Sequence, residues 1–78
     1  MEILEAAGYR CTRSAASLGA WDIVGVGADG FVLCQVKSSQ WPGAVEMEVL
    51  SGFRCPANCR RLVHRWRPYR RLPDVREL

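Results

Sequence analysis

The chain has 78 residues, of which 49% are apolar, and a net charge of +3. A single domain of this size buries only about 60% of its unfolded surface, so its core is small and a dimer would add stability. No apolar run approaches the roughly 18 residues that cross a membrane, and residues 1–7 contain glutamates where a secretory signal has basic residues. We therefore expect one cytoplasmic domain with no membrane contact.

Residues 1–7 are mainly helix formers and stop before a glycine, which is typical of a helix of about two turns. Residues 9–13 alternate bulky and basic side chains and are predicted to form a strand. The small and polar residues 14–20 predict a flexible loop, which carries Ser14 and Ser17 towards the next strand.

Two apolar, β-rich runs follow at residues 23–28 and 31–36, on either side of Asp29 and Gly30. An Asp-Gly pair between such runs is a strong signal for a hairpin, because its type I′ turn needs positive φ at both central positions. The sequence therefore predicts two antiparallel strands with Asp29 and Gly30 at their tip.

This register pairs Asp22 with Lys37 and Val24 with Gln35. Because paired and alternate residues share one face of a sheet, Asp22, Gln35 and Lys37 are predicted to converge, with Cβ atoms about 5 to 8 Å apart. A carboxylate, an amide and an ammonium are costly on an apolar hairpin unless they have partners, a metal or a substrate. This polar patch is the first candidate site.

A second helix is predicted over residues 44–53, where Met47, Leu50 and Phe53 recur at helical spacing. Its two glutamates lie off that apolar stripe. A break containing proline and glycine separates this helix from the hairpin.

Residues 60–66 are predicted to form the last strand, with Leu62, His64 and Trp66 on one face, and residues 67–78 a basic tail. A strand-helix-strand unit crosses over right-handed, so the last strand should lie parallel to its predecessor. The order helix, three strands, helix, strand therefore predicts an α/β fold (an α+β mixed sheet) in a single domain over residues 1–78.

The cysteines Cys11, Cys34, Cys55 and Cys59 are expected to be reduced thiols, since no secretory context is visible, and Cys34 is expected to be buried in its strand. Cys55 and Cys59 with His64 invite a zinc site, but the spacing lacks a second cysteine pair. A lone histidine in a strand is more often packed than catalytic.

Asp22 and the run Gln35-Val36-Lys37 match the form D…(E/Q)xK on this order of elements. Further residues fit the same pattern: Gly8, Tyr9, Arg13, Ser14, Ser17, Leu18, Gly19, Ile23, Val24, Leu50, Phe53 and Pro56. Together they resemble the PD-(D/E)XK nuclease superfamily, in particular the archaeal-type and phage Holliday junction resolvases. The resemblance implies a restriction-endonuclease-like αβββαβ core with a short first helix, and a metal-dependent site on the central hairpin.

The chain departs from this resemblance in two ways. Family members usually carry a catalytic glutamate on the first helix, about three turns before the Gly-Tyr position, whereas Glu2 and Glu5 lie too close to Gly8 and the chain begins too late to supply it. The usual glutamate of the motif is Gln35 here, which removes one negative charge from the site. We therefore expect weakened metal binding.

The resemblance implies a Mg²⁺ or Mn²⁺ ion held by Asp22, the side-chain oxygen of Gln35 and the carbonyl of Val36, all oxygen donors that suit hard cations. Lys37 would stabilise negative charge on the phosphate, and the predicted catalytic set is Asp22, Gln35, Lys37 and Ser17. The alternative is a surface ion pair between Asp22 and Lys37, worth at most about 1 kcal/mol.

The C-terminal third is strongly basic, since residues 54–78 hold eight arginines against Asp74 and Glu77. Arginines interleaved with Trp66 and Tyr69 are typical of phosphate contacts combined with stacking on bases or sugars, and the alternative is a solvated basic edge. The predicted nucleic-acid-binding residues are Arg13, Ser14, Arg60, Arg61, Arg65, Arg67, Arg70 and Arg71.

The sequence thus predicts a metal-dependent DNA endonuclease of the Holliday junction resolvase type, which hydrolyses phosphodiester bonds. A catalytically weak or inactive nucleic-acid-binding module of the same fold is the alternative. An interaction domain without a nucleic-acid role is disfavoured by the basic C-terminal third. The resemblance also implies a homodimer on branched DNA, although the motif does not distinguish branched from linear substrates.

Overall fold

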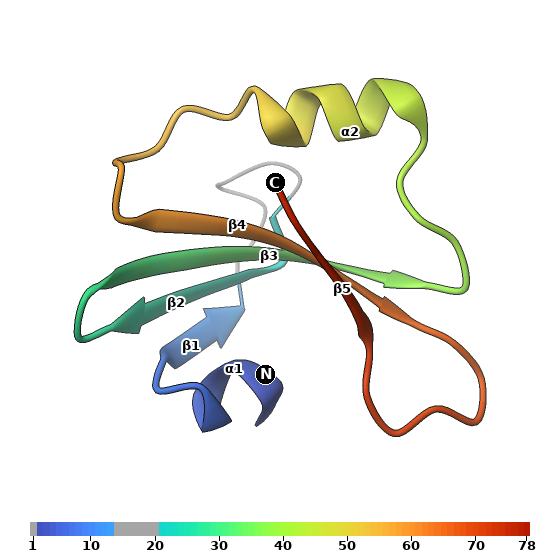
Figure 1. The fold of residues 1–78 in the computed structure, drawn as a ribbon, viewed down its shortest axis with the longest axis horizontal. Coiled ribbons are helices and arrows are strands. Elements are labelled where there is room, and N and C mark those ends of the chain that lie inside the picture. Colours follow the sequence, from blue (N-terminus) through green and yellow to red (C-terminus); the bar gives the residue numbers. More distant parts are fainter. Residues whose placement is uncertain (1, 14–20) are drawn as a thin grey trace.

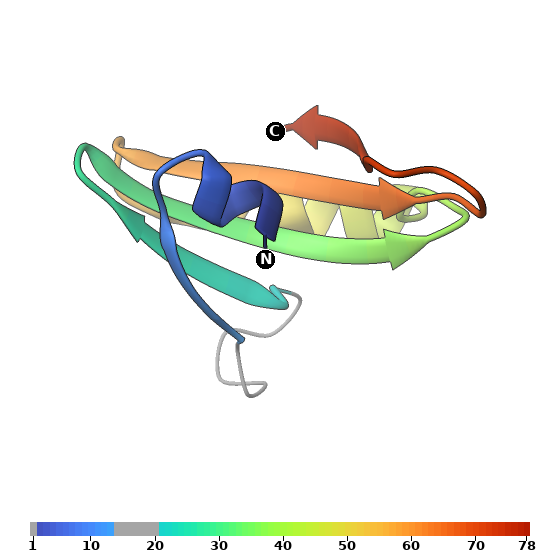
Figure 2. The same cartoon turned by 90° about the horizontal axis from the view of Figure 1, so that it is seen from below.

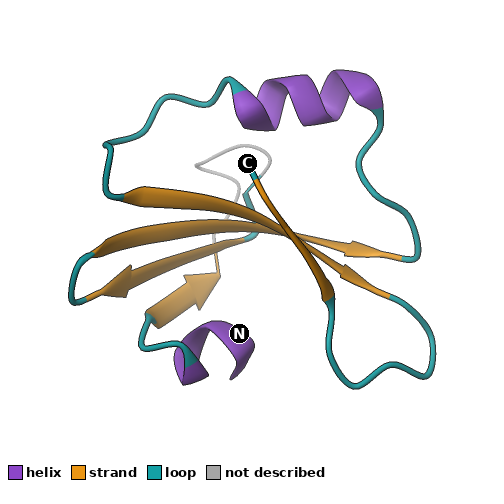
Figure 3. Cartoon of the chain, viewed as in Figure 1, coloured by secondary structure: helices purple, strands orange, loops and turns teal. Residues whose placement is uncertain are grey.

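The computed structural model describes residues 2–13 and 21–78, which form one mixed sheet with helices on its two faces (Figure 1). The elements are α1 (Glu2–Ala6), β1 (Arg10–Arg13), β2 (Ile23–Gly27), β3 (Gly30–Ser38), α2 (Ala44–Ser51), β4 (Cys59–Trp66) and β5 (Asp74–Glu77). The strand order is β1-β2-β3-β4-β5, and β3 and β4 are parallel while the other neighbours are antiparallel (Figure 3). The predicted fold class is confirmed, and the predicted site residues Ser14 and Ser17 lie outside the described residues.

Two apolar clusters cover opposite faces of the sheet, because alternate residues of each strand point to opposite sides. On the α1 face the buried cluster consists of Leu4, Ile23, Val32, Cys34 and Leu62. On the α2 face it consists of Trp21, Leu33, Leu50 and Val63. Figure 2 shows α1 in front of the sheet and α2 behind it. Neither cluster is large, as expected for a chain of this length.

The helix α2 packs through the predicted stripe. Leu50 is fully buried, and Met47 and Phe53 pack against the same α2-face cluster. The helix ends two residues earlier than predicted, with Gly52 as its C-cap residue, whose N–H donates to the Glu48 carbonyl at 3.0 Å. Within the described residues, no helix is long and apolar enough to cross a membrane.

The hairpin between β2 and β3 has a different register from the predicted one. Gly27 pairs with Gly30, so Ala28 and Asp29 occupy the turn, and neither has the positive φ of a type I′ turn. Gly30 has a φ of +155°, and a Cβ there would lie only 2.0 Å from the Asn58 carbonyl oxygen. The glycine therefore allows close backbone approach to the turn before β4 rather than occupying the hairpin turn.

This register moves the pairing of β2 and β3 by two residues. Ile23 pairs with Cys34, so Asp22, one residue earlier, aligns with Gln35 instead of Lys37. The predicted direct pairing of Asp22 with Lys37 is therefore wrong. The two faces of the strands are unchanged, since a shift by an even number of residues preserves the alternation.

A fifth strand, β5, lies within the segment predicted as a basic tail. It pairs antiparallel with β4, with Asp74 opposite Arg65, and Leu78 beyond it packs against the α2-face cluster. Its sequence signal is weak because it is a short, mostly exposed edge strand that begins directly after Pro73. Proline is tolerated at the start of an edge strand.

Cys34 and His64 are buried in their strands. All four cysteines are free, and Cys34 is fully buried, which raises the pKa of its thiol to about 12. His64 is 4% exposed on β4, and its burial lowers the pKa of the imidazole. The expectation that both residues are packed inside their strands is confirmed.

Candidate functional site

A cavity of about 390 Å³ opens at the end of the sheet where β1, β3 and β4 finish and β2 begins. These four strand ends meet there because β1 and β3 run antiparallel to β2, whereas β4 runs parallel to β3. The residues that line this Asp22 cavity are Arg13, Asp22, Ile23, Val36 and Trp66. One carboxylate and one exposed guanidinium thus share an opening with an indole.

The Asp22 carboxylate is held by the backbone of β3. Its Oδ2 atom accepts a hydrogen bond from the Val36 N–H at 2.8 Å, and the Asp22 N–H donates to the Cys34 carbonyl at 2.9 Å. Charge-assisted bonds of this kind fix the orientation of a carboxylate. Because a carboxylate has about four acceptor positions, this bond leaves Asp22 with capacity for a further donor or a metal.

Gln35 and Lys37 lie on the α2 face of β3. Both lie at alternate positions beyond Leu33, which belongs to the α2-face cluster, and Asp22 lies two residues before Val24, which packs against the same cluster. Gln35 is 7% exposed. Because Asp22 also aligns with Gln35 across the two strands, strand alternation places Asp22, Gln35 and Lys37 on one face, although Gln35 and Lys37 do not line the Asp22 cavity.

Lys37 has a partner that the sequence analysis did not identify. Its Nζ atom lies 3.4 Å from Glu46 Oε1, and both side chains are partly exposed. Among the described residues this is the ion pair that Lys37 makes, in place of the predicted alternative with Asp22. The predicted order of elements could have indicated this ion pair, because α2 follows β3 directly and its first turn must lie near the end of that strand.

The donor set suits only a weak metal site. In the part of the chain that the structure describes, no three His, Cys, Asp or Glu side chains are grouped closely enough to hold a metal ion. Mg²⁺, however, is commonly bound by one or two carboxylates and completes its shell with water and substrate phosphate. Asp22 beside the carbonyl of Val36 fits such a site, provided that DNA supplies ligands of its own.

The acidic residues of β5 bind several of the predicted DNA-binding arginines. Arg60 makes a bidentate salt bridge with Glu77, in which its Nε and Nη2 atoms donate to Oε2 and Oε1 at 3.0 and 2.9 Å. Arg65 and Arg67 both contact Asp74, at 2.7 and 2.9 Å. These hydrogen bonds and charges lower the pKa of both carboxyl groups and raise the pKa of the Arg60 guanidinium.

Two further arginines serve the architecture. The Arg61 guanidinium donates to the carbonyls of Ser51 and Phe53, and so holds the end of α2 against β4. Arg76 lies 4.4 Å from the centre of the Trp41 ring, and Arg65 lies 4.5 Å from the same ring.

The tryptophans outside β4 are packing residues. Trp21 is 1% exposed and meets Phe53 edge to face, with ring centroids 5.7 Å apart. Trp41 carries the cation–π contacts with the two arginines and packs against the α2-face cluster. The third tryptophan, Trp66, is the one that lines the Asp22 cavity.

Four of the predicted DNA-binding arginines make no salt bridge among the described residues: Arg61, which donates to backbone carbonyls, and Arg13, Arg70 and Arg71. Arg13, Arg70 and Arg71 are exposed. Arg13 lines the Asp22 cavity, and the other two lie in the loop that leaves β4 beside it. Three exposed arginines without a salt bridge therefore lie at or beside this end of the sheet.

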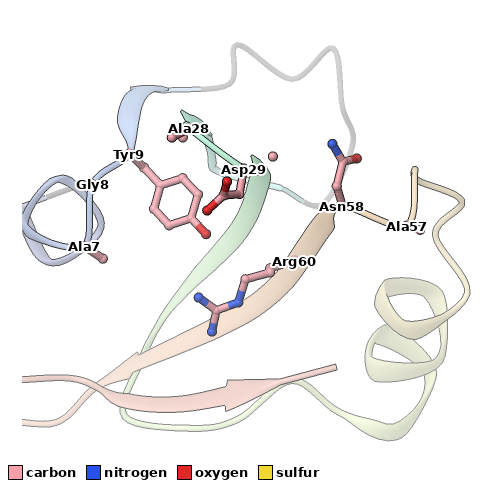
Figure 4. Close-up of a pocket in the computed structure, with 10 residues that line it drawn as sticks. Ala7, Gly8, Tyr9, Ala28, Asp29, Ala57, Asn58 and Arg60 are labelled. Carbon is pink, nitrogen blue, oxygen red and sulfur yellow. The ribbon is translucent and has the colours of Figure 1, made fainter.

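A second cavity, of about 360 Å³, lies at the opposite end of the sheet beside the hairpin tip (Figure 4). Tyr9, Asp29, Asn58 and Arg60 contribute polar side chains to its lining. The Arg60 charge there is balanced by its pair with Glu77. This hairpin-tip cavity therefore offers less positive charge than the Asp22 end.

Comparison with known proteins supports the fold. No family model matches the chain, and no curated protein matches it. Among solved structures, the chain is similar to Hjc, a Holliday junction resolvase from the archaeal hyperthermophile Archaeoglobus fulgidus, with a TM-score of 0.66. The match covers 99% of this chain and 69% of the resolvase chain at 22% sequence identity. The predicted resemblance is thus confirmed at the level of fold: this chain has the resolvase-like fold.

Proposed function

We propose that this protein is a metal-dependent DNA endonuclease of the Holliday junction resolvase type, which hydrolyses phosphodiester bonds. The proposal rests on one observation above all: on a resolvase-like fold, the Asp22 carboxylate is fixed at 2.8 Å against the Gln35-Val36-Lys37 segment, in a cavity that also holds Arg13. A fixed carboxylate beside a cation that has no carboxylate partner among the described residues suits a phosphate and its metal.

The proposed cofactor is Mg²⁺ or Mn²⁺. Asp22, the Val36 carbonyl and the Gln35 side-chain oxygen would hold it, and the bound ion would polarise the phosphate and activate water. With one carboxylate in this set, we expect millimolar rather than micromolar metal to be needed unless DNA is present.

The side chains of the chain itself have separate tasks in this proposal. The Val36 N–H keeps the Asp22 carboxylate in place at 2.8 Å, so no reorganisation is needed when the phosphate arrives. Arg13, exposed at the rim of the Asp22 cavity, binds and orients the phosphate. Lys37 leaves Glu46 and stabilises the negative charge that develops on the phosphate.

The partner in this proposal is DNA, in particular branched DNA, bound by a homodimer. The exposed Arg70 and Arg71 extend the positive charge of the Asp22 cavity along the neighbouring loop. Binding should therefore weaken steeply as salt is raised, because each phosphate contact releases counterions.

A second candidate function is DNA binding without cleavage. It is favoured by the ion pair between Lys37 and Glu46, which occupies the ammonium that catalysis requires. Both candidates share the cationic end of the sheet, and they differ in whether Lys37 becomes available on DNA binding.

The test is a cleavage and binding assay on a labelled four-way junction and a linear duplex, with Mg²⁺, with Mn²⁺ and with a chelator. We expect metal-dependent cutting by the wild type and at least a tenfold slower rate for Lys37→Ala. Arg54→Ala, which removes an exposed cation away from the Asp22 cavity, serves as the control for loss of one positive charge.

Each outcome separates the hypotheses. Salt-sensitive binding without cutting would refute the endonuclease and support the second candidate. Cutting that is unaffected by Lys37→Ala would contradict the assignment of the site. Absence of binding at low salt would contradict both functions.

A further inference from the structure

Tyr69 is presented to solvent in an unusual way. It lies in the loop of residues 67–73 between β4 and β5, which projects beyond the end of the sheet (Figure 1). Its relative exposure is 106%, and its φ is +64°. A positive φ is uncommon for a bulky aromatic residue and costs free energy. The chain thus places a large apolar ring entirely in water on a strained backbone.

The base of this loop is fixed. Asp74 binds both Arg65 and Arg67, at 2.7 and 2.9 Å, where the two strands meet. The Arg70 N–H donates to the Arg67 carbonyl at 3.3 Å and closes a turn around Tyr69. Prolines at both ends of the loop restrict its backbone further. The backbone of the loop is therefore restricted before a partner binds, which reduces the entropy lost on binding.

The surroundings of the ring are cationic. Arg70 and Arg71 directly follow Tyr69, are exposed, and make no salt bridge among the described residues. A planar aromatic ring next to such cations suits a nucleic acid strand, in which bases alternate with phosphates. An apolar protein surface would leave both guanidinium groups without partners.

The loop also lies close to the Asp22 cavity. Trp66, the last residue of β4, lines that cavity, and Tyr69 is only three residues further along the chain. Three residues span at most about 11 Å, so a base stacked on Tyr69 would belong to a nucleotide near the proposed cleavage site.

We propose that Tyr69 stacks on an unpaired DNA base beside the Asp22 cavity, while Arg70 and Arg71 bind the flanking phosphates, so that the protein selects DNA with accessible base faces over intact duplex. This inference rests on the proposed DNA-binding function and names its substrate class. In a duplex the faces of each base are covered by its neighbours, so the ring gains little there. On an accessible base, stacking strengthens binding about 5- to 100-fold.

The experiment measures the binding of full-length protein to a fluorescent single strand and to a duplex of the same sequence, at low salt with a chelator to prevent cutting. The variants are Tyr69→Ala, Tyr69→Phe and Leu72→Ala, the last being a matched control because Leu72 is a 67% exposed apolar residue of the same loop. A 2-aminopurine base in the single strand reports stacking directly through quenching of its fluorescence.

We expect Tyr69→Ala to weaken single-strand binding about 5- to 100-fold and to abolish the quenching, while duplex binding changes less than twofold. Tyr69→Phe and Leu72→Ala should resemble the wild type on both probes. Equal losses on both probes, no loss on either, or the same loss in Leu72→Ala would overturn the inference. Failure of the wild type to bind either probe would instead refute the proposed function, and cutting is not needed for this test.

Discussion

Glu46→Gln is expected to tighten DNA binding, because it removes the carboxylate that lies 3.4 Å from Lys37 Nζ. The side chains of the pair are 33% and 40% exposed. A pair this exposed is worth at most about 1 kcal/mol. If Lys37 must leave Glu46 to meet a phosphate, the energy of the ion pair is lost on binding DNA. Removing the Glu46 carboxylate should therefore improve DNA affinity by up to about fivefold.

The assay is a double-mutant cycle in DNA affinity, measured by fluorescence anisotropy at fixed low salt. Lys37→Ala should abolish the gain from Glu46→Gln, since no ammonium is then left to release. Glu48→Gln is the matched control, because it removes the same charge from the same helix at an exposed position without an ion pair among the described residues. The unfolding free energy of Glu46→Gln should fall by less than about 1 kcal/mol.

Two results would refute this reasoning. If Glu48→Gln tightens binding as much as Glu46→Gln, the effect is one of net charge and not of the ion pair. If the gain persists in the Lys37→Ala background, the ammonium of Lys37 does not take part in binding DNA.

Three further predictions concern stability. Gly30→Ala should lower the unfolding free energy by more than about 1 kcal/mol in chemical denaturation, since its Cβ would meet the Asn58 carbonyl at 2.0 Å and φ is +155°; a neutral result would contradict the close approach. Leu50→Ala should cost about 2 to 5 kcal/mol in the same assay, because Leu50 is fully buried under α2, and a cost below 1 kcal/mol would contradict that packing. Burial lowers the pKa of His64 below its ordinary 6.5, so the unfolded chain binds the proton first as the pH falls; stability should drop below pH 6.5 by up to about 1.4 kcal/mol per unit until the folded pKa is reached, and His64→Gln should flatten this dependence.

The order of the elements from α1 to β4 was predictable from the sequence, because hydrophobic periodicity and turn residues are local signals. The stripe of Met47, Leu50 and Phe53 defined α2, and the run ending at Val36 defined β3. A strand-helix-strand order then predicted the parallel pair of β3 and β4 from a general rule of chain crossover. These features depend on residues that are near one another in the sequence.

The predictions that were wrong depend on residues that are distant in the sequence. The register of the hairpin was wrong because Gly30 is required by the approach of Asn58, which lies nearly thirty residues later. β5 was missed because much of its stability comes from pairs such as Asp74 with Arg65, which no local pattern shows. For the same reason the sequence could not show which arginines form salt bridges with the carboxylates of β5 and which do not.

The candidate site was predictable in part. The sequence located Asp22 against the Gln35-Val36-Lys37 strand, and the fold brings these segments together. The orientation of each side chain was not accessible, because it depends on the Val36 N–H that holds Asp22 and on the helix that carries Glu46 to Lys37. Alternation gives the face of a side chain, whereas its partners follow from tertiary contacts.

The most direct test of the proposed metal site is the position at which Mn²⁺ binds the ¹⁵N-labelled protein. A paramagnetic ion broadens the amide signals near it, so substoichiometric Mn²⁺ should first broaden the signals of Ile23 and Val36, and should leave Gly30 at the hairpin tip sharp. Asp22→Asn should remove this effect. Broadening centred on the first turn of α2, or broadening that Asp22→Asn does not change, would contradict a metal site at Asp22 and with it the proposed chemistry.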